Sequence, residues 1–195
     1  MGMEVIMKRI IFIIMTLIVA TGSVTYLLSQ QNAPNEGKNI LNSIEINRFK
    51  TLLNEYRKQK GLIALKYTDQ VKTLSEGRLQ TIHNKVNEVP YDTLRKHMNE
   101  YFHYALYEDV LGYQIDNRDK QLTNVSENIA YFPNNSEDYL KNVQDSLSIL
   151  IMNGWIRSKP HNKVLLSNEH NSFIISAFHF NYGIIVCYLG FYGGK

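Results

Sequence analysis

Residues 173–192 have the sequence FIISAFHFNYGIIVCYLGFY, and this stretch decides the fold of the chain. Its two halves, Phe173 to Phe180 and Ile184 to Tyr192, are rich in β-branched and aromatic residues, which favour β-strands. Between them, Asn181-Tyr182-Gly183 has the composition of a short hairpin loop. The sequence therefore predicts a β-hairpin at the end of the chain.

Apolar residues upstream of this hairpin recur at helical spacing. Phe49, Leu52, Leu53 and Tyr56 fall on one helical face, and Gly61 is placed to end that helix. Three further helices are expected: one that opens near Thr68-Asp69, one from Asp92 to about Val110, and one that opens at Ser136 and ends at Gly154. Because the helices come first along the chain and the hairpin comes last, the sequence predicts an α+β domain in which helices cover an antiparallel sheet.

The first thirty residues differ from the rest of the chain. Met7-Lys8-Arg9 precedes an apolar run from Ile10 to Ala20, a pattern typical of a secretory signal. Extended through Leu28, the run corresponds to about 28 Å of helix, close to the thickness of a bilayer core. Either interpretation predicts export, with the domain extracellular or held at the cell surface by residues 10–28. The predicted division is a signal peptide or membrane anchor at 1–28, a linker at 29–42 and a domain at 43–195.

Charge and cysteine content exclude several classes of protein. The 195 residues include 21 Lys and Arg and 18 Asp and Glu, a formal net charge of +3. Because the excess is small and no Lys/Arg-rich run is present, nucleic acid is not expected as a partner. Cys187 is the only cysteine, which excludes an intrachain disulfide and a thiolate zinc site. Since it lies in an apolar strand, we expect it to be an inert core residue.

Four segments of the chain carry a resemblance when they are taken in order. They are Leu53-Asn54-Glu55-Tyr56-Arg57 followed by Gly61-Leu62 and Leu65; Glu127-Asn128-Ile129-Ala130; Trp155 to His161 (WIRSKPH) followed by Val164-Leu165-Leu166; and the closing hairpin. Together they resemble the CAP superfamily (cysteine-rich secretory, antigen-five and plant pathogenesis-related proteins), in its cysteine-poor bacterial-type branch. The resemblance implies an α-β-α sandwich with helices on both faces of a small antiparallel sheet. The sequence departs from the family pattern at two places. Ser126 stands where the family usually has glycine, and the segment between Glu127 and Trp155 is longer than in the family.

The resemblance also implies a central cavity with two histidines and two acidic residues, which hold a divalent metal in some members. His161 matches one histidine and Glu127 one acid. For the other histidine we choose His97, which precedes Gly112-Tyr113 by 15 residues, an interval similar to the family's. The rival candidates are His83 and His103, and the place of the second acid is taken by Ser158. Glu137 and Asp145, two acids of the helix expected from Ser136, are expected to be solvated, with a place in the cavity as the alternative.

Two interpretations of this residue set stay open. His97, Glu127 and His161 have the chemistry of a zinc site with an open water position. The alternative is a hydrogen-bonded polar cluster that fixes the fold. Ser158 and His161 are three residues apart, but no nucleophile-elbow motif surrounds the serine, so a serine hydrolase is not favoured.

For function, the resemblance favours an extracytoplasmic binding module over an enzyme. The expected ligand is a small apolar molecule, a cell-envelope component or a protein partner, with the membrane as a further contact if the N-terminal segment is uncleaved. The alternative is a metal-dependent hydrolase of peptides or esters that uses the same cavity. Binding is favoured because Glu127 is the only acid that the resemblance matches.

Overall fold

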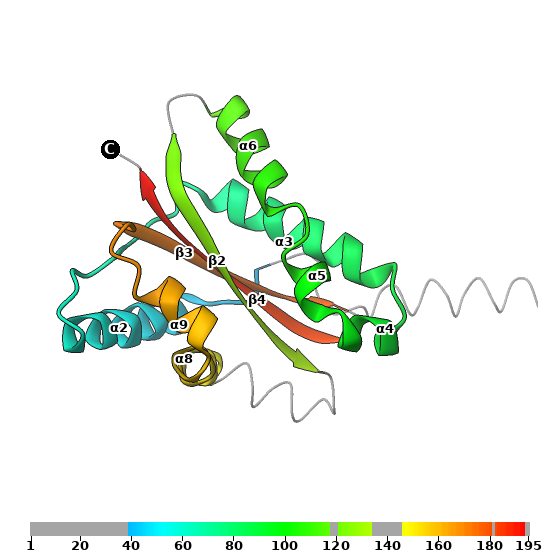
Figure 1. Ribbon diagram of the computed structural model, residues 1–195, viewed down its shortest axis with the longest axis horizontal. Helices are drawn as coiled ribbons and strands as arrows, with labels where there is room; N and C mark the ends of the chain where they lie inside the picture. The colour runs from blue at the N-terminus through cyan, green and yellow to red at the C-terminus, as the bar shows by residue number, and fades with distance from the viewer. Residues whose placement is uncertain (1–38, 118–120, 134–145, 181, 194–195) are drawn as a thin grey trace, which may run out of the picture. The chain divides into compact units, whose positions relative to one another are not determined.

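The computed structural model describes residues 39–117, 121–133, 146–180 and 182–193 (Figure 1). The helices are α2 (Ser43–Gln59), α3 (Lys72–Asn87), α4 (Tyr91–Lys96), α5 (Met98–Phe102), α6 (Leu106–Asp116), α8 (Leu147–Arg157) and α9 (Lys159–Leu165). The strands are β1 (Lys66–Tyr67), β2 (Leu122–Pro133), β3 (Ser172–Phe180) and β4 (Gly183–Gly193). Within these ranges, no helix has both the length and the apolar character needed to cross a bilayer. The predicted signal peptide or anchor lies outside the described residues.

The sheet has the strand order β1-β3-β4-β2. Strands β3 and β4 form the predicted hairpin, in which Phe180 pairs with Gly183 and Ser172 with Phe191. Strand β2, which contains the Glu127-Asn128-Ile129-Ala130 segment, pairs antiparallel with β4. The two-residue strand β1 is parallel to β3, so the sheet is antiparallel except at this edge. The predicted hairpin at the end of the chain is confirmed.

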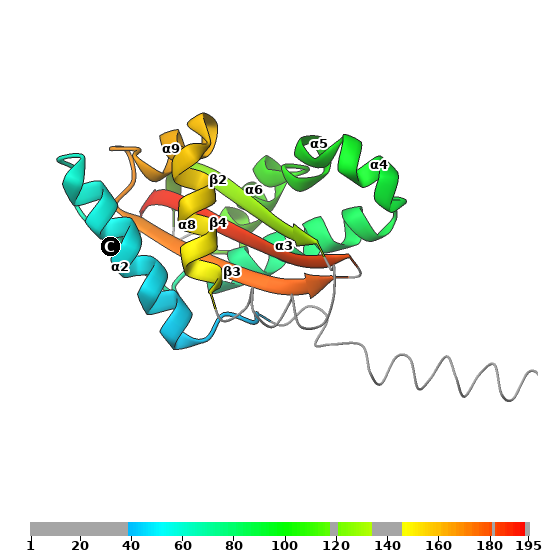
Figure 2. The ribbon, with the colours of Figure 1, turned by 90° about the horizontal axis from the view of Figure 1, so that it is seen from below.

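Helices cover both faces of the sheet, as Figures 1 and 2 show. Alternate residues of β3 face opposite ways, because side chains alternate along a strand. Phe173 and Ile175 pack in a core with α2 and α8, whereas Ile174 and Phe178 pack in a second core with α3. Trp155 of α8 belongs to the first core. The predicted α+β fold with an α-β-α sandwich is confirmed.

Helix boundaries differ from the sequence predictions at three places. Helix α3 begins at Lys72, because the Thr68 N–H donates to Phe173 O and keeps that segment extended beside β3. Helix α8 continues through Gly154 to Arg157 and stops where Pro160 opens α9. The single helix expected from Asp92 is three short helices, α4 to α6, and Ala105 between the last two has a left-handed φ of 55°. The predicted helix start at Ser136 lies outside the described residues.

Two glycines provide a matched test of the packing. A Cβ at Gly190 would lie 2.4 Å from His170 Nδ1 and 2.9 Å from the Tyr188 hydroxyl, whereas a Cβ at Gly154 would meet no atom within 4 Å. We expect Gly190→Ala to lower the free energy of unfolding by about 1–3 kcal/mol through overpacking. Gly154→Ala should raise it by about 0.5–1 kcal/mol, because glycine in a helix costs backbone entropy. Urea unfolding of both variants measures this, and a neutral result at Gly190 would contradict the packing described.

Candidate functional site

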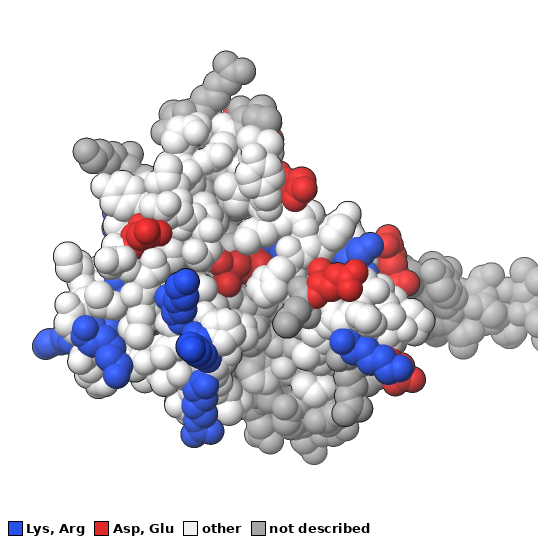
Figure 3. Space-filling model, viewed as in Figure 1, with Lys and Arg blue, Asp and Glu red and all other residues white. Residues whose placement is uncertain are grey.

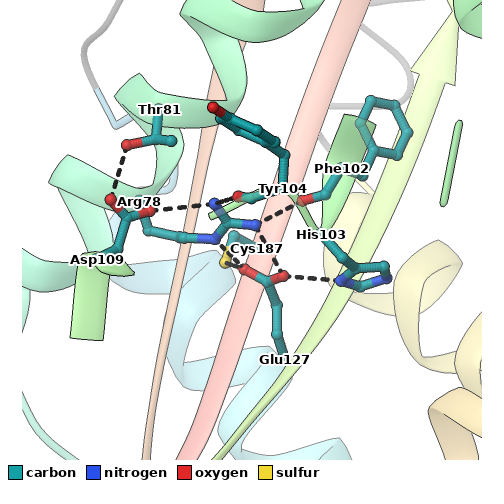
Figure 4. Close-up of polar contacts among 8 residues, drawn as sticks. All are labelled: Arg78, Thr81, Phe102, His103, Tyr104, Asp109, Glu127 and Cys187. Atoms are coloured by element: carbon teal, nitrogen blue, oxygen red, sulfur yellow. Dashed lines mark hydrogen bonds and ion pairs between the residues drawn. The ribbon is translucent and has the colours of Figure 1, made fainter. Parts of the chain in front are cut away.

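The candidate site is built around Arg78, which projects from the middle of α3 towards β2 (Figure 4). Arg78 lies on the buried face of α3, four residues after Leu74 and four before Ile82, and its side chain is fully buried. A buried guanidinium needs a counter-charge and acceptors for its N–H groups, since it remains protonated in proteins. Glu127 of β2 supplies the counter-charge.

All five N–H donors of Arg78 have acceptors. Nε donates to Glu127 Oε1 at 2.6 Å, and Nη2 donates to Glu127 Oε2 at 3.1 Å, which is the bidentate geometry of a strong ion pair. Nη2 also donates to Phe102 O at 2.7 Å. Nη1 donates to Tyr104 O and, at 3.1 Å, to Asp109 Oδ2. One side chain therefore joins α3, the α5–α6 connection, α6 and the sheet.

Glu127 has two further partners. His103 Nδ1 lies 2.8 Å from Oε2 and must carry the proton, because an ionised carboxylate only accepts. The thiol of Cys187 donates to Oε1 at 3.4 Å. Burial by itself would raise the pKa of Glu127, but the hydrogen bonds from His103 and Arg78 outweigh burial and lower the pKa below its usual value. Glu127 is therefore an ionised carboxylate whose oxygens are all in use.

Cys187 is fully buried in β4, as the sequence predicts for a core residue. Burial is the largest cause that raises the pKa of its thiol well above the usual value, and the negative charge of Glu127 adds to it. Since the thiolate is the nucleophilic form, this cysteine is unreactive.

His161 lies in the first turn of α9, beside the same part of the sheet. Its Nδ1 is 2.9 Å from Ser158 Oγ, its ring centroid is 6.2 Å from that of Trp155, and its carbonyl accepts from Asn128 Nδ2 at 3.0 Å. Burial lowers the pKa of His161, and the positive charge of protonated His103 lowers it further. His161 is therefore neutral at neutral pH, and it is close enough to His103 for the two charges to interact.

The structure thus brings together Glu127, His161 and His103, and not His97. His97 ends α4 with its side chain 53% exposed, and it lies 3.6 Å from Glu100 of the same segment. The histidine at Glu127 is His103, one of the two rival candidates, because the chain turns back between α5 and α6. The other rival, His83, contacts Asn87 and the Phe178 ring.

Arg78 and Asp109 belong to the site but are not among the residues predicted from the sequence. A signal for Arg78 is present in the sequence, since it is the one charged residue at a helical spacing from the apolar Leu74 and Ile82. Asp109 Oδ1 accepts from Thr81 Oγ1 at 2.9 Å, so α6 is fixed to α3 at two adjacent points. Glu137 and Asp145 lie outside the described residues.

The residues present do not fit a divalent metal ion. In the part of the chain that the structure describes, no group of three or more His, Cys, Asp or Glu side chains is placed to hold one. Glu127 directs both oxygens at Arg78, and His103 directs Nδ1 at Glu127 and not at a shared point with His161. A cation bound to Glu127 would also lie against a buried guanidinium, and like charges at such distances repel strongly.

Comparisons with solved structures give similar folds, including the two below. No protein-family model and no curated protein sequence matches the chain. The structure is similar to that of a cysteine-rich secretory protein of Staphylococcus aureus, with a TM-score of 0.45 and 18% identity. That match covers 81% of this chain, which spans 40% of the length of the S. aureus protein. An outer surface protein of Borrelia burgdorferi has a TM-score of 0.43 and 16% identity, over 78% of this chain and 96% of that protein.

The ion pair predicts a specific dependence of stability on pH. Because the pKa of folded Glu127 lies below its unfolded value, the ionised carboxylate adds stability that is fully present above about pH 4.3 and is lost as pH falls through the folded pKa. Glu127→Gln should lower the free energy of unfolding at pH 7 by about 3–5 kcal/mol, since Arg78 then lacks its counter-charge. The variant should also lack this part of the acid-induced loss.

The matched control is Glu108→Gln, which removes an exposed carboxylate from α6. We expect a change within about 0.5 kcal/mol at pH 7, as for most surface substitutions. Chemical unfolding between pH 3 and pH 7 measures both variants. Equal effects of the two substitutions would show that the Arg78–Glu127 pair does not stabilise the fold.

Proposed function

We propose that this chain is an extracytoplasmic binding module and not an enzyme. The observation that supports this proposal most strongly is the full use of the Glu127 carboxylate. A carboxylate offers about four lone-pair positions, and Glu127 has four contacts, from Arg78 Nε, Arg78 Nη2, His103 and Cys187. A general base needs a free lone pair and a pKa near the working pH, whereas the pKa of Glu127 is lowered.

The surface available to a ligand lies at the two histidines. The His103 side chain is 40% exposed, and its Nδ1 is bound to Glu127, so Nε2 is the ring nitrogen left for a ligand. His161 is partly exposed and has Ser158 at Nδ1, so its Nε2 is likewise the ring nitrogen left for a ligand. The Trp155 ring packs against His161 from the core side and is itself only 3% exposed. A small uncharged molecule with one hydrogen-bonding group fits such a site better than a metal ion does.

Other classes of ligand remain part of the proposal. A cell-envelope component or a protein segment would meet the same imidazoles if it carried an apolar group and a hydrogen-bond donor. The basic flank and the apolar run of the first 28 residues support export, by which the domain would meet such partners. Zinc held by His103, Glu127 and His161 would require Arg78 to release the carboxylate, and a metal-dependent hydrolase would require the same change.

Trp155 is the only tryptophan of the chain, so its fluorescence reports on this site. We expect dansyl amide, an uncharged apolar probe with a hydrogen-bonding group, to accept energy from Trp155 in a saturable manner. His161→Ala and His103→Ala should each weaken this binding about fivefold, the effect of one lost hydrogen bond. His97→Ala, which changes an exposed histidine outside the site, should leave the affinity unchanged.

The same proteins distinguish the enzymatic alternative. We expect no turnover of peptide or p-nitrophenyl ester substrates, and no increase in melting temperature when zinc replaces chelator. Zinc-dependent turnover that His161→Ala abolishes would overturn the proposal in favour of a hydrolase. Equal dansyl amide affinity in all four proteins would show that the histidines do not form the binding site.

A further inference from the structure

The two helical layers of the domain differ strongly in charge. Residues 39–67 and 146–167, which contain α2, α8 and α9, include nine Lys and Arg but only two Asp and Glu, for a net charge of +7. Residues 68–117, which contain α3 to α6, include five Lys and Arg and eight Asp and Glu, for a net charge of −3. The small net charge of the whole chain therefore conceals one basic side. Figure 3 shows Lys and Arg side chains gathered over α2, α8 and α9.

The basic side is a solvent-exposed surface. Seven of its nine basic residues are exposed, including Lys58 on α2 and Lys159 and Lys163 on α9. Of its two acids, Glu45 is buried, where it accepts from the N–H of Ser148 at the start of α8 at 2.9 Å and pairs with Arg48. Its charge is thereby neutralised away from the solvent, and Glu55 is the only exposed acid within these two ranges.

The same side also carries most of the exposed aliphatic side chains. Ile44 and Ile63, near the two ends of α2, are 67% and 86% exposed, and Ile149 and Leu150 on α8 are 44% and 41% exposed. On the rest of the described surface, the large exposed hydrophobic residues are three tyrosines and Leu111. A shallow cavity of about 190 Å³ between α2 and α8, bordered by Ile149, adds apolar surface.

The helices that carry these residues form one layer. Ser148 Oγ of α8 donates to Glu45 O of α2 at 2.7 Å, and Ile44 and Ile149 are the sequence neighbours of this bonded pair. At the other end of α2, the Tyr56 hydroxyl donates to Asn162 of α9 at 3.0 Å. Figure 2 shows α2, α8 and α9 on one side of the sheet. Aliphatic and basic side chains are therefore presented together on a fixed scaffold.

We propose that this basic, aliphatic surface of α2, α8 and α9 docks on a bilayer of anionic phospholipid. Each Lys or Arg near such a bilayer contributes attraction to the headgroups, and exposed isoleucines gain free energy where the hydrocarbon phase receives them. An anionic polymer in water would match the charges but would leave Ile44 and Ile63 in water. The combination therefore favours the bilayer.

The predicted N-terminal organisation would keep the domain close to a membrane. If residues 10–28 are retained as an anchor, the domain is tethered to the bilayer through the residues that precede α2. Docking is then an intramolecular step at a high effective concentration of lipid surface, so even weak attraction is sufficient. The proposal is independent of the ligand site at His103 and His161.

The test uses the full chain in vesicles, with a fluorophore on a single introduced cysteine. Ile63→Cys places the label on the proposed surface, and Tyr107→Cys, 74% exposed on α6, is the matched control. The native Cys187 is buried and will not be labelled. We expect spin-labelled lipid to quench the label at residue 63 at least twofold more in phosphatidylglycerol than in phosphatidylcholine vesicles. The label at residue 107 should show no such difference, and 1 M salt, where the Debye length is about 3 Å, should abolish the effect.

Charge variants complete the test. Lys58→Glu with Lys163→Glu should weaken docking by more than about 25-fold, since each lost lysine counts for about fivefold. Lys96→Glu, the same change at an exposed position of α4, should have no effect. Ile44→Ser should weaken docking on the bilayer, and an unchanged signal would favour an anionic polymer instead. Equal quenching of the labels at residues 63 and 107 would overturn the proposal. So would a label at residue 63 that is shielded from solvent in lipid-free protein that sediments as a dimer.

Discussion

The buried ion pair between Arg78 and Glu127 is the interaction on which the described structure depends. Arg78 comes from α3, Glu127 from the sheet, and the remaining acceptors of the guanidinium come from the α5–α6 connection and from α6. Among the side chains that the structure describes, α5 and α6 contribute Phe102 and Tyr113 as buried members of the α3-side core, and Met98, Tyr101, Leu106 and Val110 pack against it. The position of these helices over the sheet is therefore set by this packing together with the polar contacts to Arg78, and His103 is placed at the site as a result.

The ion pair also determines what the site can do. A carboxylate held by a guanidinium, an imidazole and a thiol is a stable anion, which makes it a poor base and a poor metal ligand. The chemistry exposed to a ligand is that of the His103 and His161 imidazoles. This distribution, with the ion pair buried and hydrogen-bonding groups at the surface, suits recognition of a molecule that carries a hydrogen-bonding group. The strong charges of the domain lie elsewhere, on the outer side of α2, α8 and α9.

The local sequence pattern was sufficient to predict the hairpin, helix α2 and two of the site residues. The β-branched and aromatic composition of residues 173–192 and the helical spacing around Phe49 are properties of neighbouring residues, and Glu127 and His161 lie in segments that resemble a family. The choice between His97 and His103 depended on the path of the chain between α4 and α6, which a left-handed residue at Ala105 redirects. The partnership of Arg78 with Glu127 spans 49 positions in the sequence, and no local pattern encodes such a pair.

A double-mutant cycle on Arg78→Met and Glu127→Leu tests the central role of this pair most directly. Each single substitution leaves one charge buried without its partner and should lower the free energy of unfolding by about 3–5 kcal/mol. The double variant removes both charges and is predicted to be more stable than either single variant, which requires a coupling energy of at least about 3 kcal/mol. If the two single effects sum to the effect of the double substitution within about 0.5 kcal/mol, the central role of the pair is contradicted.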